Sequence, residues 1–251
     1  MSILHNLTPF FTVIIVEDQF TFRCKLLTNK LDCLSIPKNK MAASIEILSG
    51  HRFRRPRFAE ILSSAFADDP FYTFVFPDAQ RRTRLLPWLF NKLLSYANQY
   101  GLVLADSNYH GISVWLEPKH TRLLPLGVLR AGLFLFPFKV SHLELKRSIM
   151  LAQVSNQLHR QAVSTPHFYL EAVGVEPLHQ GKGLGRALVQ AGISRADELQ
   201  VPSYLETHNL ANLGFYISLG FNIVGSEKPF PSAPQVWGLL RTPQRGENSS
   251  M

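Results

Sequence analysis

The sequence predicts an α/β fold built on a mixed sheet, and its C-terminal third carries most of this prediction. Strand-like and helix-like runs alternate there, and the last two strands are too close together for a helical crossover between them. These two strands must therefore run antiparallel, whereas the earlier strand-helix-strand order is typical of parallel pairing. The predicted strands and helices are, in chain order, 168–175, 187–200, 202–207, 209–220, 221–225 and 235–241.

The first half of the chain supports the same fold class with alternating periods. Apolar residues recur at helical spacing after Pro56, through 85–94 up to Gly101, and around 151–158. Period-two alternation predicts a strand at 44–48 and a hairpin of two strands at 101–105 and 112–116.

Changes in hydrophobic pattern along the chain divide it into three segments. Residues 41–243 have regular periods and are predicted to form one domain, and 244–251 are a C-terminal tail. Residues 1–40 have no clear period beyond one strand-like run. We expect an extension that is disordered or lies upstream of the true start at Met41, and an extra edge strand is the alternative.

Composition narrows the class of protein. The 251 residues carry a net charge of +8, which suits polyanionic ligands, but the basic residues are scattered, so no nucleic-acid partner is expected. Two cysteines, Cys24 and Cys33, argue against a disulfide scaffold and favour a cytoplasmic protein. The apolar runs 7–16 and 123–138 are too short or too interrupted for a membrane span, although the second suits an exposed apolar lid or membrane-surface patch.

A glycine-rich turn, QGKGLG, separates the strand at 168–175 from the following helix. Gly181, Gly183 and Gly185 allow a tight turn, and the helix behind them directs free N–H groups at an approaching anion. Lys182 and Arg186 either add charge there or are simply solvated. The spacing excludes a P-loop and a G-x-G-x-x-G dinucleotide fingerprint, and it fits Q/R-x-x-G-x-G/A.

The surrounding residues make the pattern more specific. The run VGVEPLHQGKGLGRALV at 173–189 resembles the central motif of the GNAT superfamily of acyl-CoA N-acyltransferases. The run NLANLGFYISLGF at 209–221 resembles the next motif of that family, an Asn followed seven residues later by a Tyr and then by Gly-Phe. The resemblance implies a largely antiparallel central sheet, flanked by helices, with a splayed central pair of parallel strands.

The resemblance also implies a reaction. A GNAT-like enzyme transfers an acetyl or short acyl group from acetyl-CoA to a primary amine by direct attack in a ternary complex. The expected acceptor is a small-molecule or peptide amine, and a homodimer is left open. The alternative is a catalytically inactive acyl-CoA-binding module with a regulatory or interaction role.

The coenzyme-binding residues are carried over from the family motifs. Val173 and Val175 are expected to bind the pantetheine arm through main-chain groups, and Asn209 is expected to hydrogen-bond the same arm. The pyrophosphate is assigned to the glycine loop, which comprises Gly181, Lys182, Gly183, Leu184, Gly185 and Arg186.

Two side chains are expected to move protons. Tyr216 matches the general acid of the family, although a core role on an amphipathic helix is the alternative. Glu171 is the candidate base, predicted on the same side of its strand as Tyr169 and Val173, with Glu206 or a purely structural role as alternatives.

Other polar residues near the motifs are given simpler roles. Asp68 and Asp69 either line the amine pocket or act as turn residues before Pro70. His179 and His208 have no partners at metal-ligand spacing along the sequence, so they are interpreted as loop histidines and no metal is expected.

Overall fold

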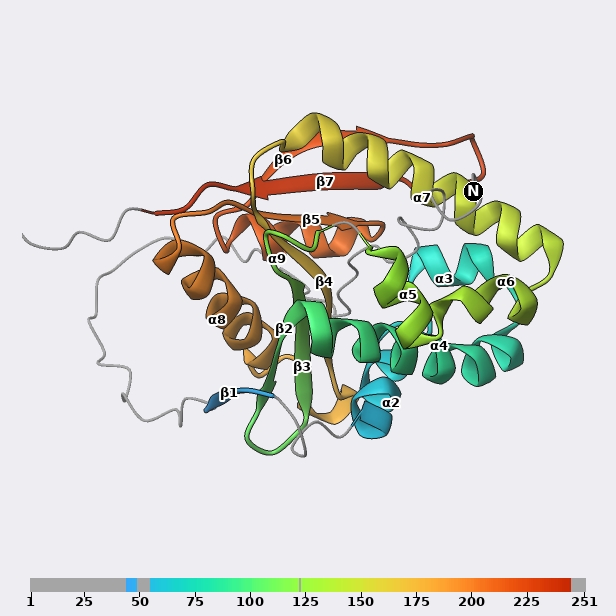
Figure 1. The fold of residues 1–251 in the computed structure, drawn as a ribbon, viewed down its shortest axis with the longest axis horizontal. Coiled ribbons are helices and arrows are strands. Elements are labelled where there is room, and N and C mark those ends of the chain that lie inside the picture. Colours follow the sequence, from blue (N-terminus) through green and yellow to red (C-terminus); the bar gives the residue numbers. More distant parts are fainter. Residues whose placement is uncertain (1–43, 49–54, 122, 245–251) are drawn as a thin grey trace, which may run out of the picture.

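A computed structural model describes residues 44–48, 55–121 and 123–244 (Figure 1). The predicted extension 1–40, with both cysteines, and nearly all of the tail 244–251 lie outside these ranges. The domain boundaries and the cytoplasmic location therefore stay predictions.

The α/β class is confirmed, because strands and helices alternate through the described residues. The prediction missed the short helices α3, α5 and α6, which are too brief to show a helical period. In chain order the elements are β1 (Ile45–Ile47), α2 (Arg55–Ala65), α3 (Pro70–Val75), α4 (Ala79–Tyr100), β2 (Gly101–Asp106), β3 (Gly111–Leu116), α5 (Pro125–Ala131), η2 (Leu133–Leu135), α6 (Phe136–Lys139), α7 (His142–Ala162), β4 (Phe168–Val175), η3 (Pro177–His179), α8 (Leu184–Glu198), β5 (Ser203–Thr207), η4 (Leu210–Asn212), α9 (Leu213–Ile217), β6 (Asn222–Glu227) and β7 (Val236–Arg241).

The sheet is mixed and largely antiparallel, as the family resemblance implied. Its strand order is β1-β2-β3-β4-β5-β7-β6, and β4–β5 is the parallel pair among these strands. That pairing is confined to Phe168 with Ser203 and Tyr169 with Tyr204, although both strands continue beyond it. The two central strands therefore diverge after Tyr169, near the start of β4.

Helices cover both faces of the sheet (Figure 1). Helix α8 packs against β2, β3 and β4, while α2 and α4 pack together and against the other face, and α7 lies along β6 and β7. Trp115 of β3 is fully buried under α8, with its ring 6.4 Å from that of Phe168. The core thus spans the sheet, and the diverging strands lie near its centre.

A β-bulge interrupts β4 at Glu171. In the pairing with β3, Ala172 lies opposite Val114 while Leu170 lies opposite Trp115, so no residue of β3 lies opposite Glu171. An extra residue in one strand reverses the alternation of side chains beyond it. The bulge therefore decides which face each half of β4 presents.

The two halves of β4 accordingly face different helices. Val173 lies opposite Ser113, whose hydroxyl donates a hydrogen bond to the carbonyl of Leu188 in α8. Tyr169 instead contacts the ring of His159 in α7. We expected Tyr169, Glu171 and Val173 to lie on one side of β4. This expectation is wrong, because simple alternation does not hold across a bulge.

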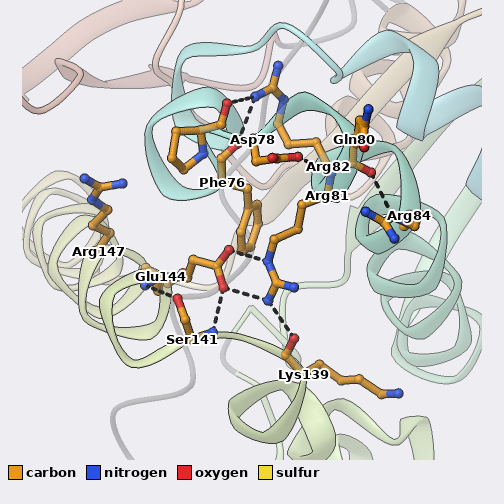
Figure 2. Close-up of polar contacts among 12 residues, drawn as sticks. Phe76, Asp78, Gln80, Arg81, Arg82, Arg84, Lys139, Ser141, Glu144 and Arg147 are labelled. Carbon is orange, nitrogen blue, oxygen red and sulfur yellow. Dashed lines mark hydrogen bonds and ion pairs between the residues drawn. The ribbon is translucent and has the colours of Figure 1, made fainter.

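Polar contacts tie the helices beside the sheet together (Figure 2). Arg81 of α4 donates to Glu144 of α7, with Nη2 2.8 Å from Oε2, and Glu144 also completes a capping box with Ser141. Burial opposes ionisation of Glu144, but the hydrogen bonds from Arg81 and Ser141 outweigh burial and lower its pKa. Arg82, which is largely buried, donates to the carbonyls of Ala67, Phe76 and Pro77.

We predict that Gly192→Ala destabilises the fold, because a Cβ there would lie 2.1 Å from the buried ring of Trp115. Overpacking of this kind costs roughly 1–3 kcal/mol, which urea unfolding would measure. Gly214→Ala is the control, because a Cβ at Gly214 meets nothing within 4 Å. Equal losses in the two variants would show that the contact between α8 and Trp115 is not tight.

Candidate active site

The glycine loop has the backbone that its spacing predicts. Gly181 and Gly183 have φ of 68° and 82°, a left-handed conformation that favours glycine, and a Cβ on either would meet nothing within 4 Å. The α8 helix begins at Leu184, and its first hydrogen bond runs from the Ala187 N–H to the Gly183 carbonyl. The N–H groups of the first turn thus lack acceptors within the helix, which suits an anion.

Val173 and Val175, the two predicted main-chain contacts of the coenzyme, present their backbone groups at the edge of β4 that faces away from β3. The N–H of Glu176 donates to the carbonyl of His110, so alternation places the main-chain groups of Val173 and Val175 on the opposite edge. There β5 has already diverged from β4. One of these groups already has a partner in the protein, because Nε2 of Gln180 donates a hydrogen bond to the Val175 carbonyl at 2.9 Å.

The two basic residues of the loop already have protein contacts. Lys182 is exposed and donates to the carbonyl of Leu178 at 2.8 Å. Arg186 donates to the hydroxyl of Ser218 and lies 5.8 Å from the centre of the Phe215 ring. Arg186 therefore connects the first turn of α8 to α9, the short helix that carries Tyr216.

Two buried glutamates lie where β4 and β5 part. Glu171 and Glu206 each follow the last paired tyrosines, Tyr169 and Tyr204, by two residues. Burial and the neighbouring Glu206 raise the pKa of Glu171 well above its usual range. Burial raises the pKa of Glu206 to about 8, against the opposing effect of the neighbouring hydroxyls of Tyr169 and Tyr204. Each carboxyl therefore resists ionisation unless a positive charge arrives.

These two carboxyl groups differ in how they are held. The hydroxyl of Tyr169 donates to Oε2 of Glu206 at 2.6 Å. Oε1 of Glu171 is buried and has no hydrogen-bond partner among the described residues. Oε1 of Glu206 likewise has no hydrogen-bond partner among the described residues, so the two base candidates differ in the bond that Tyr169 makes to Glu206.

A third buried carboxyl, Asp69, belongs to the same neighbourhood. It caps α3 by accepting the Phe71 N–H at 2.8 Å, and burial raises its pKa well above the usual range. Burial, Asp69 and Glu171 raise the pKa of the Tyr72 hydroxyl, so this hydroxyl is close enough to both carboxyls to be affected by their charge. In the described ranges, no lysine or arginine forms an ion pair with Asp69, Glu171 or Glu206.

The remaining polar candidates have different environments. The structure shows the turn role for the two aspartates, since Asp69 caps a helix and the side chain of Asp68 is 98% exposed. His208 lies in the loop after β5, as expected, but it is buried against the Phe71 ring, and burial lowers its pKa to about 3. His179 stacks on His110, a contact that sequence spacing missed because 69 positions separate them.

Tyr216 has the core position considered as its alternative role, and Asn209 caps a helix, which does not conflict with a coenzyme contact. Tyr216 is fully buried between the rings of Phe215 and Phe221. Asn209 accepts the Ala211 N–H at 3.0 Å and caps η4 rather than a long helix. Their roles toward the coenzyme stay predictions.

Comparisons with known proteins agree with this arrangement. A family model described as the acetyltransferase (GNAT) family matches residues 148–221, from α7 through the glycine loop to α9. The chain is 28% identical over 169 residues to an uncharacterized N-acetyltransferase of Schizosaccharomyces pombe, which covers 65% of this chain and 68% of that protein. It is 47% identical over 53 residues to a mycothiol acetyltransferase of Kocuria rhizophila, or 20% of this chain and 18% of that protein.

Solved structures support the fold. A Corynebacterium glutamicum structure described as histone acetyltransferase HPA2 and related acetyltransferase has a TM-score of 0.55 at 23% identity, covering 83% of this chain and all, 100%, of that one. Arylalkylamine N-acetyltransferase 2 of Aedes aegypti has a TM-score of 0.55 at 16% identity, covering 79% and 98%. Within the described ranges, the search for a helix long and apolar enough to cross a membrane found none. The family match over residues 148–221, the N-acetyltransferase relative and the shared fold agree, so the chain is similar to GNAT acetyltransferases, and this similarity supports an acyltransferase.

Proposed function

We propose that this protein transfers an acetyl or other short acyl group from acetyl-CoA to a primary amine, by direct attack in a ternary complex. One observation carries the proposal. A single strand, β4, has a buried carboxyl at its bulge and runs directly into a loop that is open to an anion. A donor that is bound at this loop and extends along β4 would bring its acyl group toward that carboxyl.

The donor is assigned to the glycine loop and to the edge of β4. The left-handed glycines and the first-turn amides of α8 fit a pyrophosphate, with Lys182 and Arg186 adding charge. The exposed edge of β4 at Val173 and Val175 fits the amide groups of the pantetheine arm, and Asn209 lies at the end of β5. Acetyl-CoA, when bound, supplies the acyl group as a thioester that an amine can attack.

The acceptor is assigned to the acidic neighbourhood. Asp69, Glu171 and Glu206 are buried without an ion pair to lysine or arginine among the described residues, and an ammonium group would relieve the cost of ionising them. An amine attacks only after it loses a proton. Oε1 of Glu171 is placed to accept that proton directly or through a water molecule.

The departing sulfur needs a proton, and Tyr216 is the proposed donor. Its ring packs against Phe215 of α9 and against Phe221, which precedes β6, and Arg186 links the glycine loop to α9. This link would fix the position of the Tyr216 hydroxyl relative to the bound acetyl-CoA. Main-chain N–H groups at the open edge of β4 are the proposed donors to the carbonyl oxygen, where negative charge develops.

The function is tested by coenzyme binding and thiol release. We expect acetyl-CoA to bind in calorimetry and to be consumed with at least one member of an amine panel of polyamines, arylalkylamines, aminoglycosides and lysine peptides. Gly183→Ala should weaken acetyl-CoA binding roughly tenfold, because left-handed strain of about 1–3 kcal/mol shifts the loop.

Gly220→Ala is the matched control, since Gly220 also has a positive φ, of 89°, but lies outside the glycine loop. Coenzyme affinity should be unchanged in this variant. Binding of acetyl-CoA without thiol release from any amine would favour an acyl-CoA-binding module instead, and no binding would remove the donor assignment.

We predict that Glu171→Gln lowers kcat/KM roughly a hundredfold or more, the effect expected for a lost general base. Burial raises the pKa of Glu171, and a base works only when deprotonated. In the wild type, kcat/KM should therefore rise with pH through a pKa above the usual carboxyl range. In Glu171→Gln, kcat/KM should rise with pH only through deprotonation of the amine substrate.

Glu206→Gln is the companion variant and should cost less, because Glu206 Oε2 is already bonded to Tyr169. A larger loss in Glu206→Gln than in Glu171→Gln would transfer the role of base to Glu206.

Replacement of Tyr216 by Phe should reduce kcat by roughly tenfold or more while acetyl-CoA affinity changes little, because the lost hydroxyl acts on the leaving group. Steady-state kinetics and calorimetry on the same preparation separate the two effects. Tyr100→Phe on α4 is the control for a tyrosine outside the site. Full turnover in Tyr216→Phe would exclude this tyrosine as the acid.

A further inference from the structure

We propose that His110, Glu176 and His179 form a binding site for one divalent transition-metal ion, with Zn²⁺ as the representative ion. The three residues come from separate places in the fold: the β2–β3 turn, the position after β4, and the end of η3. One potential ligand atom from each lies within 4.8 Å of the other two. Two imidazoles and a carboxylate, with a fourth position left to water, form an established ligand set for zinc.

The distances suit tetrahedral coordination. Nδ1 of His179 lies 3.4 Å from Oε2 of Glu176. Two ligands that each lie about 2.0–2.1 Å from a tetrahedral zinc ion are about 3.3–3.4 Å apart. This nitrogen is buried yet makes no hydrogen bond to a described residue, so it has a lone pair or proton without a role in the fold.

The third ligand lies directly beside the other two. The rings of His110 and His179 stack with centroids 3.6 Å apart and planes within 9° of parallel. Parallel rings direct their nitrogens side by side, so one ring must turn slightly for both to reach the same ion. Both histidines are only partly buried, which leaves room for this rotation.

Neighbouring charges already orient the ligands. Arg57 binds Oε1 of Glu176 at 2.5 Å, which leaves Oε2 for the ion. Asp106 lies 3.6 Å from Nδ1 of His110 and is itself held by the backbone N–H groups of the turn, so Nε2 of His110 is the nitrogen left for the ion. Carboxylates and hydrogen-bond donors behind the ligands are typical of metal sites and tune their affinity.

The proposed ion would connect the β2–β3 hairpin to the segment that leads into the glycine loop. His179 directly precedes Gln180, whose side chain closes the loop onto β4, and His110 belongs to the β2–β3 hairpin. A bound ion would therefore brace the loop against the hairpin. The role is structural, and it does not depend on the acyl-transfer reaction.

The test uses the full chain with Cys24→Ser and Cys33→Ser, which removes competing thiols, after metals are stripped with a chelator. Calorimetric titration with ZnCl₂ should show one ion per chain. His110→Ala or His179→Ala should each raise the Kd at least about tenfold, since even indirect ligand partners have effects of this size. The control is His142→Ala, an exposed histidine at the start of α7, which should bind as the parent does.

Thermal unfolding gives a second readout that needs no enzyme activity. Zn²⁺ should raise the Tm of the parent and of His142→Ala, because an ion that binds only the folded state stabilises it, and should not raise the Tm of His110→Ala. Binding that does not saturate at one ion, or equal affinity in His110→Ala and His142→Ala, would show adventitious surface binding only and overturn the proposal.

Discussion

The divergence of β4 from β5 is the constraint on which the rest of the site depends. Backbone groups in a protein interior need hydrogen-bond partners, and the outer edge of β4 loses its strand partner after Tyr169. Gln180 satisfies one such group at Val175, but it does so from the glycine loop. The strand edge and the loop are thereby coupled, so a donor that occupies the edge also contacts the helix behind the loop.

The second feature of the site is its buried negative character. Buried carboxyls without a positive partner are costly. In the described part of the chain Asp69, Glu171 and Glu206 form no ion pair with lysine or arginine, and their pKa values are raised instead. A cation placed beside these carboxyls would favour their ionised form. The chain is basic overall, so this acidity is local and reflects where three side chains meet.

Local patterns of the sequence were a sound guide to the elements. The apolar run at 168–175 is β4, the helix that opens after the glycines is α8, and the hairpin of β2 and β3 lies where alternation placed it. Hydrophobic period and glycine placement are local properties, so they can be interpreted without tertiary contacts. The bulge at Glu171 has no local signature, and so simple alternation placed Val173 on the wrong face.

The sequence by itself determined the family resemblance, the glycine loop and the helix that follows it, because these depend on residues a few positions apart. Only the tertiary structure decided which distant side chains share a neighbourhood. Glu171 meets Glu206 because two parallel strands stop pairing just before them, and His110 meets His179 because a hairpin turn folds beside η3. Contacts of this kind arise from strand register and packing between elements, which local spacing does not encode.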